Sequence, residues 1–158
     1  MHTASRYHDI SCGHRVVGHE NKCRHLHGHN YRVHFHCKAD IGSQSLDSIG
    51  RVIDFGVIKE KLCMWLEHNW DHRFLIWEED PLLPYLQEAL AEGLGEEYSL
   101  CEVAFNPTAE NMAEFLVNLV GPFLLAETGV LLYKVEIEET RKCSASYEYK
   151  KGCCNDKV

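Results

Sequence analysis

Apolar and polar residues alternate without a break between Tyr31 and Ile41. The odd positions of this stretch are apolar or small, and the even positions are polar. A β-strand has this period of two when one of its faces is buried. Continued backwards, the same phase places His29 on the buried side. We therefore predict a long strand over residues 28–41 with His29 near its beginning. If the strand conformation persists through Gly28, His27 lies on the same buried side.

Shorter patterns predict the remaining elements. Asp54 is expected to cap a helix, because apolar residues follow it at helical spacing, and Pro107-Thr108 is a typical helix start. The apolar faces of these two helices are expected to be Phe55, Ile58, Leu62 and Leu66, and Met112, Phe115, Leu116 and Leu119. Residues 69–76 are interpreted as irregular. Further strands are expected at 7–13, 100–105, 131–140 and 143–150, and a short helix at 82–92.

The order of these elements predicts an α+β fold with a β-hairpin at each end and helices between the hairpins. The hairpins would form a small antiparallel sheet with open edges. Such edges need to be covered. We therefore expect the chain to self-associate, for example into a closed barrel.

Composition limits the classes of protein and of partner. The 158 residues are 45% apolar and 25% charged, which fits one domain, expected over 1–150 with a tail at 151–158. The apolar runs are far shorter than the roughly 20 residues of a membrane helix, and the first residues lack the apolar core of a signal peptide. We therefore expect a cytoplasmic protein without membrane contact, whose eight cysteines are reduced. The net charge of −8, without a basic run, argues against nucleic acid as a partner.

His27 and His29 are candidate metal ligands. Two imidazoles at positions i and i+2 of a strand project to the same side from Cα atoms roughly 6.6 Å apart, so both can reach one ion. His14 is the best candidate for a third ligand, because it ends the strand that should pair with the long strand. Three neutral imidazoles leave zinc its full charge and an open position, which suits activation of a hydroxyl or carbonyl group.

Cys23 lies shortly before these two histidines and has two interpretations. It is either a fourth ligand in a closed structural site or a free thiol beside an open metal ion. In the second case the metal ion, Lys22 and Arg24 would favour the thiolate form. The same cations, with Arg32, would supply local positive charge for a phosphorylated small molecule.

Acidic residues and one further histidine are candidates for ligand binding and proton transfer. Glu139 continues the buried phase of the strand at 131–140, and a buried carboxylate needs a partner such as the paired N–H groups of a ligand. The other interpretation is that the strand has ended or twisted there, which would leave Glu139 exposed. Asp71-His72 places an acid beside an imidazole, which suits a proton relay, although such a dipeptide alone is not specific.

These residues resemble the 6-pyruvoyltetrahydropterin synthase/6-carboxytetrahydropterin synthase family. The matching pieces span nearly the whole domain in the family's order. They are His14, Cys23-x-x-x-His27-Gly28-His29-Asn30-Tyr31, Val52-Ile53-Asp54-Phe55, Asp71-His72, Pro107-Thr108-Ala109-Glu110-Asn111, and Glu139-Thr140 with Tyr147. The resemblance implies the tunnelling fold (T-fold), with an antiparallel four-stranded sheet and a helix pair between two β-hairpins. It also implies barrel-forming trimers that pair into a homohexamer, with active sites between subunits.

The resemblance further implies a zinc site and a catalytic thiol. His14, His27 and His29 would bind Zn²⁺. Cys23 would be the thiolate that abstracts a proton from the substrate.

Other roles are implied by the same resemblance. Asp71 and His72 would form a proton relay that reaches the thiolate across a subunit boundary. Glu139 would hold the pterin ring and take part in the relay. Thr108 and Glu110 match a segment that lies near the pterin in relatives, and the alternative is that they cap a helix.

The gap of three residues between Cys23 and His27 is similar to that of bacterial 6-carboxytetrahydropterin synthases. The resemblance to this branch implies conversion of 7,8-dihydroneopterin triphosphate to 6-carboxytetrahydropterin, with release of acetaldehyde and triphosphate, for 7-deazaguanine and queuosine synthesis. The alternatives are a 6-pyruvoyltetrahydropterin synthase and a non-catalytic, zinc-stabilised assembly protein. The chain departs from its relatives at Ser11-Cys12-Gly13, where small alanines are usual, and in its longer stretch from Arg73 to Asn106.

Overall fold

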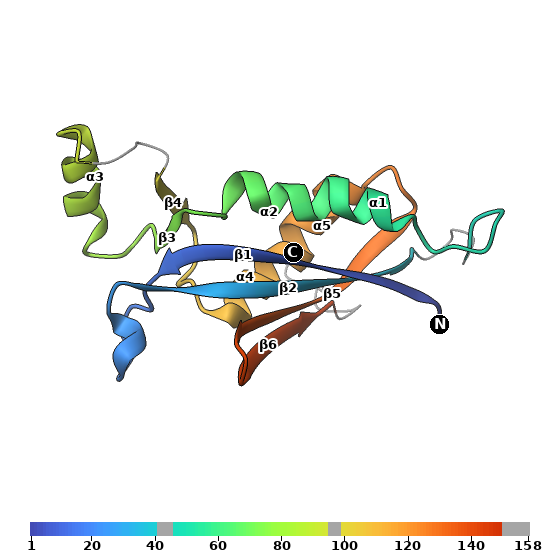
Figure 1. The fold of residues 1–158 in the computed structure, drawn as a ribbon, viewed down its shortest axis with the longest axis horizontal. Coiled ribbons are helices and arrows are strands. Elements are labelled where there is room, and N and C mark those ends of the chain that lie inside the picture. The colour runs from blue at the N-terminus through green and yellow to red at the C-terminus, as the bar shows by residue number, and fades with distance from the viewer. Residues whose placement is uncertain (41–45, 95–98, 150–158) are drawn as a thin grey trace, which may run out of the picture.

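Six strands form one mixed sheet in the computed structural model, which describes residues 1–40, 46–94 and 99–149 (Figure 1). They are β1 (Thr3–His14), β2 (His27–Ala39), β3 (Phe74–Trp77), β4 (Leu100–Val103), β5 (Val130–Thr140) and β6 (Cys143–Glu148). Their order across the sheet is β4-β3-β1-β2-β5-β6. The pairs among β1, β2, β5 and β6 are antiparallel, whereas β3 and β4 are added to the β1 edge in parallel. The tail expected at 151–158 lies outside the described residues.

Two helical segments cover one face of the sheet, and α3 (Leu83–Ala91) lies apart from them, beyond β3 and β4 (Figure 1). The first segment is α1 (Phe55–Ile58), a π-helical turn (Lys59–Cys63) and α2 (Met64–Asn69). The second is α4 (Ala109–Phe115), a π-helical turn (Leu116–Val120) and α5 (Gly121–Leu125). The predicted α+β arrangement, with a helix pair between two hairpins, is confirmed. None of the described helices has the length and apolar character needed to cross a membrane.

The core lies between the sheet and the helix pair. Tyr31, Val33, Phe35 and Cys37 of β2 are fully buried, which confirms the predicted alternation. The helices contribute Ile58, Leu62, Leu66, Met112 and Leu116, and β5 contributes Leu132, Val135 and Ile137. Because the histidine positions of β2 continue the phase of its buried residues, the metal-site candidates lie at one end of this core.

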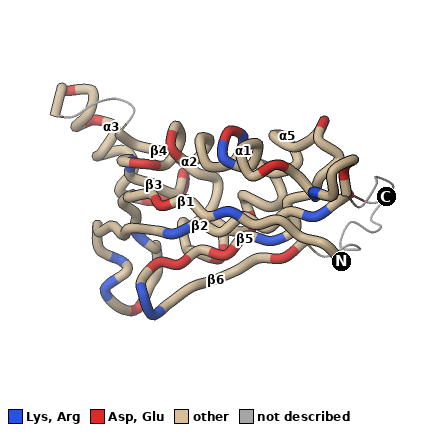
Figure 2. Tube along the Cα trace, turned by 45° about the vertical axis from the view of Figure 1, so that its right-hand side comes forward, with Lys and Arg blue, Asp and Glu red and all other residues tan. Residues whose placement is uncertain are grey.

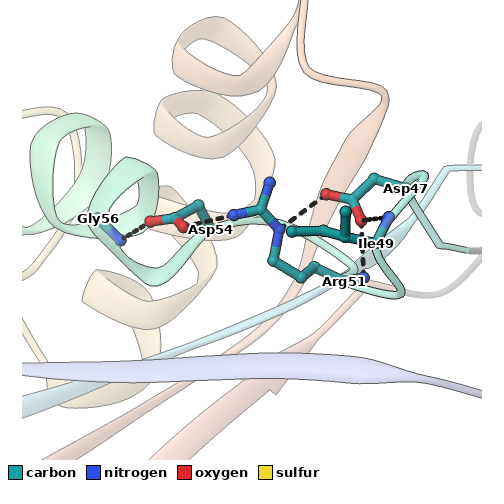
Figure 3. A network of polar contacts seen from close by, with 5 residues as sticks. All are labelled: Asp47, Ile49, Arg51, Asp54 and Gly56. Carbon is teal, nitrogen blue, oxygen red and sulfur yellow. Dashed lines mark hydrogen bonds and ion pairs between the residues drawn. The ribbon is translucent and has the colours of Figure 1, made fainter.

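The predicted cap of the first helix is present and belongs to a small charge network (Figure 3). Asp54 Oδ1 accepts a hydrogen bond from the backbone N–H of Gly56 at 2.7 Å. Arg51 bridges two carboxylates, that of Asp54 at 2.7 Å and that of Asp47 at 2.8 Å, and Asp47 also accepts the backbone N–H of Ile49. A capping side chain satisfies a free N–H of the first helical turn. The network therefore fixes where this loop enters the helix.

The predictions of a four-stranded sheet and of an irregular segment at 69–76 were wrong in detail. Phe74–Trp77 forms β3, in which Phe74 pairs with Gly13 of β1. The signal in the sequence was a run of four apolar residues. Strands of a parallel sheet are buried on both faces, so their residues need not alternate between apolar and polar. The stretch between Arg73 and Asn106 thus adds two strands and a helix to the edge of the sheet.

Two predicted core positions on the helices were also wrong. Phe55 is 58% exposed and Leu119 is 61% exposed. Leu119 lies in the second π-helical turn, where i→i+5 bonding adds a residue and turns later side chains around the helix axis. Val117 and Val120 are buried in that turn instead.

Candidate metal centre and active site

Three histidines meet at one end of the β1–β2 ladder. His14 is directly opposite His27, and Cys12 is directly opposite His29. Opposed residues of an antiparallel pair project from the same face of the sheet. This register therefore brings the side chain of His14 to those of His27 and His29, and one ring nitrogen from each lies within 4.8 Å of the other two.

Backbone carbonyls fix the tautomers of two of the rings. His14 Nδ1–H donates to the carbonyl oxygen of Pro107, and His27 Nδ1–H donates to that of His25, both at 2.7 Å. In each ring the Nε2 lone pair is therefore left for another partner. The Nε2 atoms of His27 and His29 are buried and have no hydrogen-bond partner among the described residues. Leaving such atoms unpaired is unfavourable, so both nitrogens fit the role of metal ligands.

The Nε2 atom of His14 is instead capped by Tyr31, a residue whose function the sequence analysis did not assign. The Tyr31 hydroxyl lies 3.0 Å from this nitrogen and is the donor, because the ring proton of His14 is on Nδ1. Burial lowers the pKa of His14 to about 4 and raises the pKa of Tyr31, so both side chains are neutral at neutral pH. The available signal was a polar hydroxyl in the buried phase of the strand, since buried tyrosines usually have a hydrogen-bond partner.

Gly28 allows the two strands to approach closely between the candidate ligands. It pairs with Gly13, and a Cβ atom at Gly28 would lie 2.9 Å from the carbonyl oxygen of Cys12. The obstacle is backbone, which cannot move aside as a flexible side chain can. Glycine at this position therefore keeps β1 close enough for His14 to stand beside His27.

The donor set fits a transition-metal ion. Imidazole nitrogen suits zinc, copper, iron and nickel, and three imidazoles with one open position are typical of a catalytic zinc site. Within the described ranges, the metal-binding group consists of His14, His27 and His29 without Cys23. Burial lowers the pKa of His29, although the Glu139 carboxylate, 3.4 Å from its Nε2, acts in the opposite direction. In His14 and His29, burial thus favours the neutral form that binds metals.

Cys23 and Glu139 lie at a cavity of about 320 Å³ on the His14 side of the triad. Cys23 is a half-buried free thiol in a short 3₁₀ turn, and its carbonyl oxygen accepts the N–H of Val16 at 2.8 Å. Glu139 is half-buried, near the end of β5. It is therefore neither fully buried nor fully exposed, the two interpretations that the sequence allowed. The structure therefore brings the thiol, the carboxylate and one candidate metal ligand to one hollow.

The same cavity is lined by Thr108 and Glu110. Thr108 also caps α4, because its hydroxyl accepts the N–H of Asn111 at 3.2 Å. Two residues before Thr108, Asn106 exchanges two hydrogen bonds with the backbone of Val17, both at 2.9 Å. These contacts hold the start of α4 against the loop that carries Cys23.

Asp71 and His72 form a pair on the outer side of β1. Asp71 accepts the N–H of Ser11 at 2.8 Å and lies 2.6 Å from His72 Nδ1. Burial raises the pKa of Asp71, but these hydrogen bonds outweigh burial, and its pKa is below the ordinary value. His72 has a φ of 57°, which is uncommon for a residue other than glycine, and its side chain is 81% exposed. The acid therefore orients an imidazole that points away from the protein.

The triad separates this pair from the thiol. His72 lines a cavity of about 630 Å³ together with His27 and His29. Cys23 lines the cavity of about 320 Å³ on the other side. Within one chain, the predicted relay and the predicted thiolate thus face different cavities.

Known proteins resemble the chain over most of its length. The family model described as 6-pyruvoyl tetrahydropterin synthase matches residues 3–150. The chain belongs to this family. It is 33% identical over 135 residues to the 6-carboxy-5,6,7,8-tetrahydropterin synthase of Rickettsia typhi, which covers 85% of this chain and 91% of the relative. The protein of the same name from Aquifex aeolicus is 35% identical over 132 residues, covering 81% and 76%.

Solved structures confirm the fold class. An uncharacterized protein from Wolinella succinogenes has a TM-score of 0.79 and 28% identity, covering 94% of this chain and 98% of its own. The 6-pyruvoyl tetrahydropterin synthase of Caenorhabditis elegans has a TM-score of 0.58 and 23% identity, covering 94% and 95%. The second likeness is to the fold alone. The predicted T-fold of this family is therefore the fold of the chain.

Proposed function

We propose that the chain is a zinc-dependent carbon–carbon lyase, a 6-carboxytetrahydropterin synthase. It would convert 7,8-dihydroneopterin triphosphate to 6-carboxy-5,6,7,8-tetrahydropterin, releasing acetaldehyde and triphosphate, in cytoplasmic 7-deazaguanine and queuosine synthesis. The observation that carries the proposal is the convergence of three imidazoles beside a cavity lined by Cys23 and Glu139. The names of the Rickettsia and Aquifex relatives support the same reaction.

His14, His27 and His29 would hold the zinc ion. When bound, zinc would polarise the side-chain hydroxyls of the substrate and make the adjacent C–H more acidic. The two Nδ1–carbonyl hydrogen bonds orient their rings before an ion arrives, as outer partners of metal-binding histidines do. The chain thus contributes a prearranged set of ligands on two paired strands.

Cys23 would accept the proton from the substrate carbon, and Glu139 would bind the pterin ring. A carboxylate can accept two parallel N–H groups, which fixes both the position and the orientation of a planar ring. Because both residues line one cavity, a ring held by Glu139 presents its side chain to the thiol. Thr108 and Glu110 line the same hollow and would contact the ring. Cleavage of the carbon–carbon bond then requires a retro-aldol-type step at a polarised hydroxyl.

Asp71 and His72 would handle the second proton transfer in a homohexamer. A His72 imidazole that is exposed, oriented by an acid and held in a rare backbone conformation is the arrangement expected of a functional group. Since it faces a different cavity from Cys23 of its own chain, we infer that it serves the thiol of a neighbouring subunit.

Product analysis tests the reaction. Zinc-loaded protein incubated with 7,8-dihydroneopterin triphosphate is expected to release acetaldehyde and triphosphate in equal amounts. Triphosphate without acetaldehyde, together with a pyruvoyl pterin, would identify a 6-pyruvoyltetrahydropterin synthase instead. Unchanged substrate would contradict both activities.

A non-catalytic, zinc-stabilised assembly protein would use Cys23 as a fourth ligand. The three-histidine composition of the metal-binding group in the described residues supports a free thiol. Cobalt substitution separates the alternatives, because a cobalt–thiolate bond gives a strong absorption band. We expect no such band, and its presence would favour the structural site.

A further inference from the structure

Cationic residues are sequence neighbours of residues that line two walls of the cavity beside Cys23. On one wall, two of them are the immediate neighbours of Cys23 in the 3₁₀ turn Lys22–Arg24. On the other wall, two precede Cys143, a lining residue at the start of β6. We call this group the cationic rim; it consists of Lys22, Arg24, Arg141 and Lys142. All four side chains are exposed, and Figure 2 shows basic segments on both the β1–β2 loop and the β5–β6 turn.

Among the described residues, the rim cations lack the acidic partners that three other arginines have. Arg15, Arg32 and Arg51 form ion pairs with aspartates at 2.8–2.9 Å. Within the described ranges, no rim side chain forms an ion pair with a carboxylate. Arg24 donates only to the backbone carbonyl oxygen of Glu20, at 3.1 Å, which leaves its charge uncompensated. The rim is thus a local positive region on a chain with a net charge of −8.

The interior of the cavity has the opposite charge. Glu110 and Glu139 line it, beside the uncharged Thr108. Carboxylates accept N–H groups and repel anions, whereas free guanidinium and ammonium groups bind phosphate oxygens. A ligand with N–H groups at one end and several negative charges at the other therefore fits with its neutral ring inside and its charged end at the rim.

We propose that the cationic rim binds the triphosphate of the substrate, with Lys22 and Arg24 on one side and Arg141 and Lys142 on the other. This assignment rests on the proposed function, which supplies a substrate with a triphosphate tail. It gives the rim the task of aligning the substrate, because a tail held at the mouth and a ring held by Glu139 define the position of the carbon between them. Arg141 also lines a neighbouring cavity of about 450 Å³, so the tail can extend over the β5–β6 turn.

Inorganic tripolyphosphate is the probe, since it carries the charge of the tail without the pterin. Binding is measured by calorimetry at low and high salt for three proteins: wild type, Lys22→Ala/Lys142→Ala, and the control Lys59→Ala/Lys61→Ala. The control removes two cations from the helix that begins at Phe55, and neither has an ion pair among the described residues. Zinc content is measured before and after each titration, because tripolyphosphate also binds metal ions.

The rim variant is expected to bind tripolyphosphate about tenfold more weakly than wild type, because two exposed charge contacts of about threefold each multiply to roughly this factor. The control is expected to bind about as tightly as wild type. High salt should weaken wild-type binding more than that of the rim variant. With 7,8-dihydroneopterin triphosphate as substrate, the KM of the rim variant should be higher than that of wild type, while kcat should change less.

Equal affinities of the rim variant and the control would overturn the assignment, even if the enzyme forms acetaldehyde. Conversely, tripolyphosphate binding that depends on the rim in a protein without lyase activity would retain the anion site and reject the proposed reaction. If Lys22→Ala/Lys142→Ala does not fold, the single variants Lys22→Gln and Lys142→Gln provide the same comparison. Each is then expected to weaken binding by about threefold.

Discussion

The two cavities beside the histidine triad differ in the chemistry that they offer. The cavity of about 320 Å³ has the thiol of Cys23 and the carboxylate of Glu139. The cavity of about 630 Å³ has the imidazole of His72, oriented by Asp71. Each therefore has one half of the proposed proton-transfer groups. Under the proposed mechanism, one chain alone is therefore incomplete, and a second chain would supply the missing half.

The largest expected effect comes from removing the thiol of the smaller cavity. Cys23→Ala should lower the rate of acetaldehyde release by roughly 10³-fold, the range expected for a lost general base. Zinc content should remain at about one ion per chain, because three histidines complete the ligand set. Metal analysis beside the rate assay checks both statements. Loss of zinc in this variant would instead make Cys23 a ligand.

The next effect tests whether the two cavities cooperate between chains. His72→Ala should lower the rate by roughly 10²-fold. Mixed oligomers assembled from Cys23→Ala and His72→Ala chains should regain activity, because some of their sites combine an intact thiol with an intact imidazole. Mixtures of Cys23→Ala and Cys23→Ser chains serve as the control and should stay inactive. If the first mixture also stays inactive, a relay between subunits is wrong.

A smaller effect distinguishes the ligands within the triad. Tyr31 caps Nε2 of His14, whereas the corresponding nitrogens of His27 and His29 make no hydrogen bond in the described structure. The Glu139 carboxylate lies 3.4 Å from that of His29. A metal ion must displace the Tyr31 hydroxyl, so Tyr31→Phe should bind zinc about tenfold more tightly in chelator competition. Without metal, the unfolding free energy of Tyr31→Phe should be about 1 kcal/mol lower than that of wild type, because the variant lacks the hydrogen bond to His14.

The matched control for this substitution is Tyr133→Phe, which removes a hydroxyl from β5 of the same sheet. It should leave zinc affinity unchanged. Equal zinc affinity in Tyr31→Phe and wild type would show that the hydroxyl does not compete with the ion.

The smallest effect concerns Asp71, the acid that orients His72. The pKa of Asp71 is below its ordinary value of 3.8, so the ionised carboxylate stabilises the folded state. Wild type should exceed Asp71→Asn by about 1 kcal/mol in unfolding free energy at neutral pH. This difference should persist down to pH 3.8 and disappear as the pH falls further, through the lowered pKa. Denaturant unfolding across that range measures it, and a difference that already disappears above pH 3.8 would contradict the sign of the shift.

Local patterns predicted most of the fold and part of the site. The period of two along β2 placed His27 and His29 correctly, since a strand's alternation is a property of neighbouring residues. The caps at Asp54 and Thr108 were predicted for the same reason. The predictions failed at Phe74–Trp77 and at Leu119, because a short parallel strand and a π-helical turn lack the periods on which such reasoning depends.

The sequence by itself determined the family, the three candidate ligands and the strand that carries two of them. Only the tertiary structure decided that Pro107 orients His14, that Tyr31 caps it, and that the two proposed proton-transfer groups face different cavities. The physical reason is separation along the chain. A few neighbouring residues set which residue type stands at a ligand position and on which face of the strand it lies. The tautomer of the ligand, its burial and the cavity that it faces depend on strand register and on contacts with residues far away in the sequence.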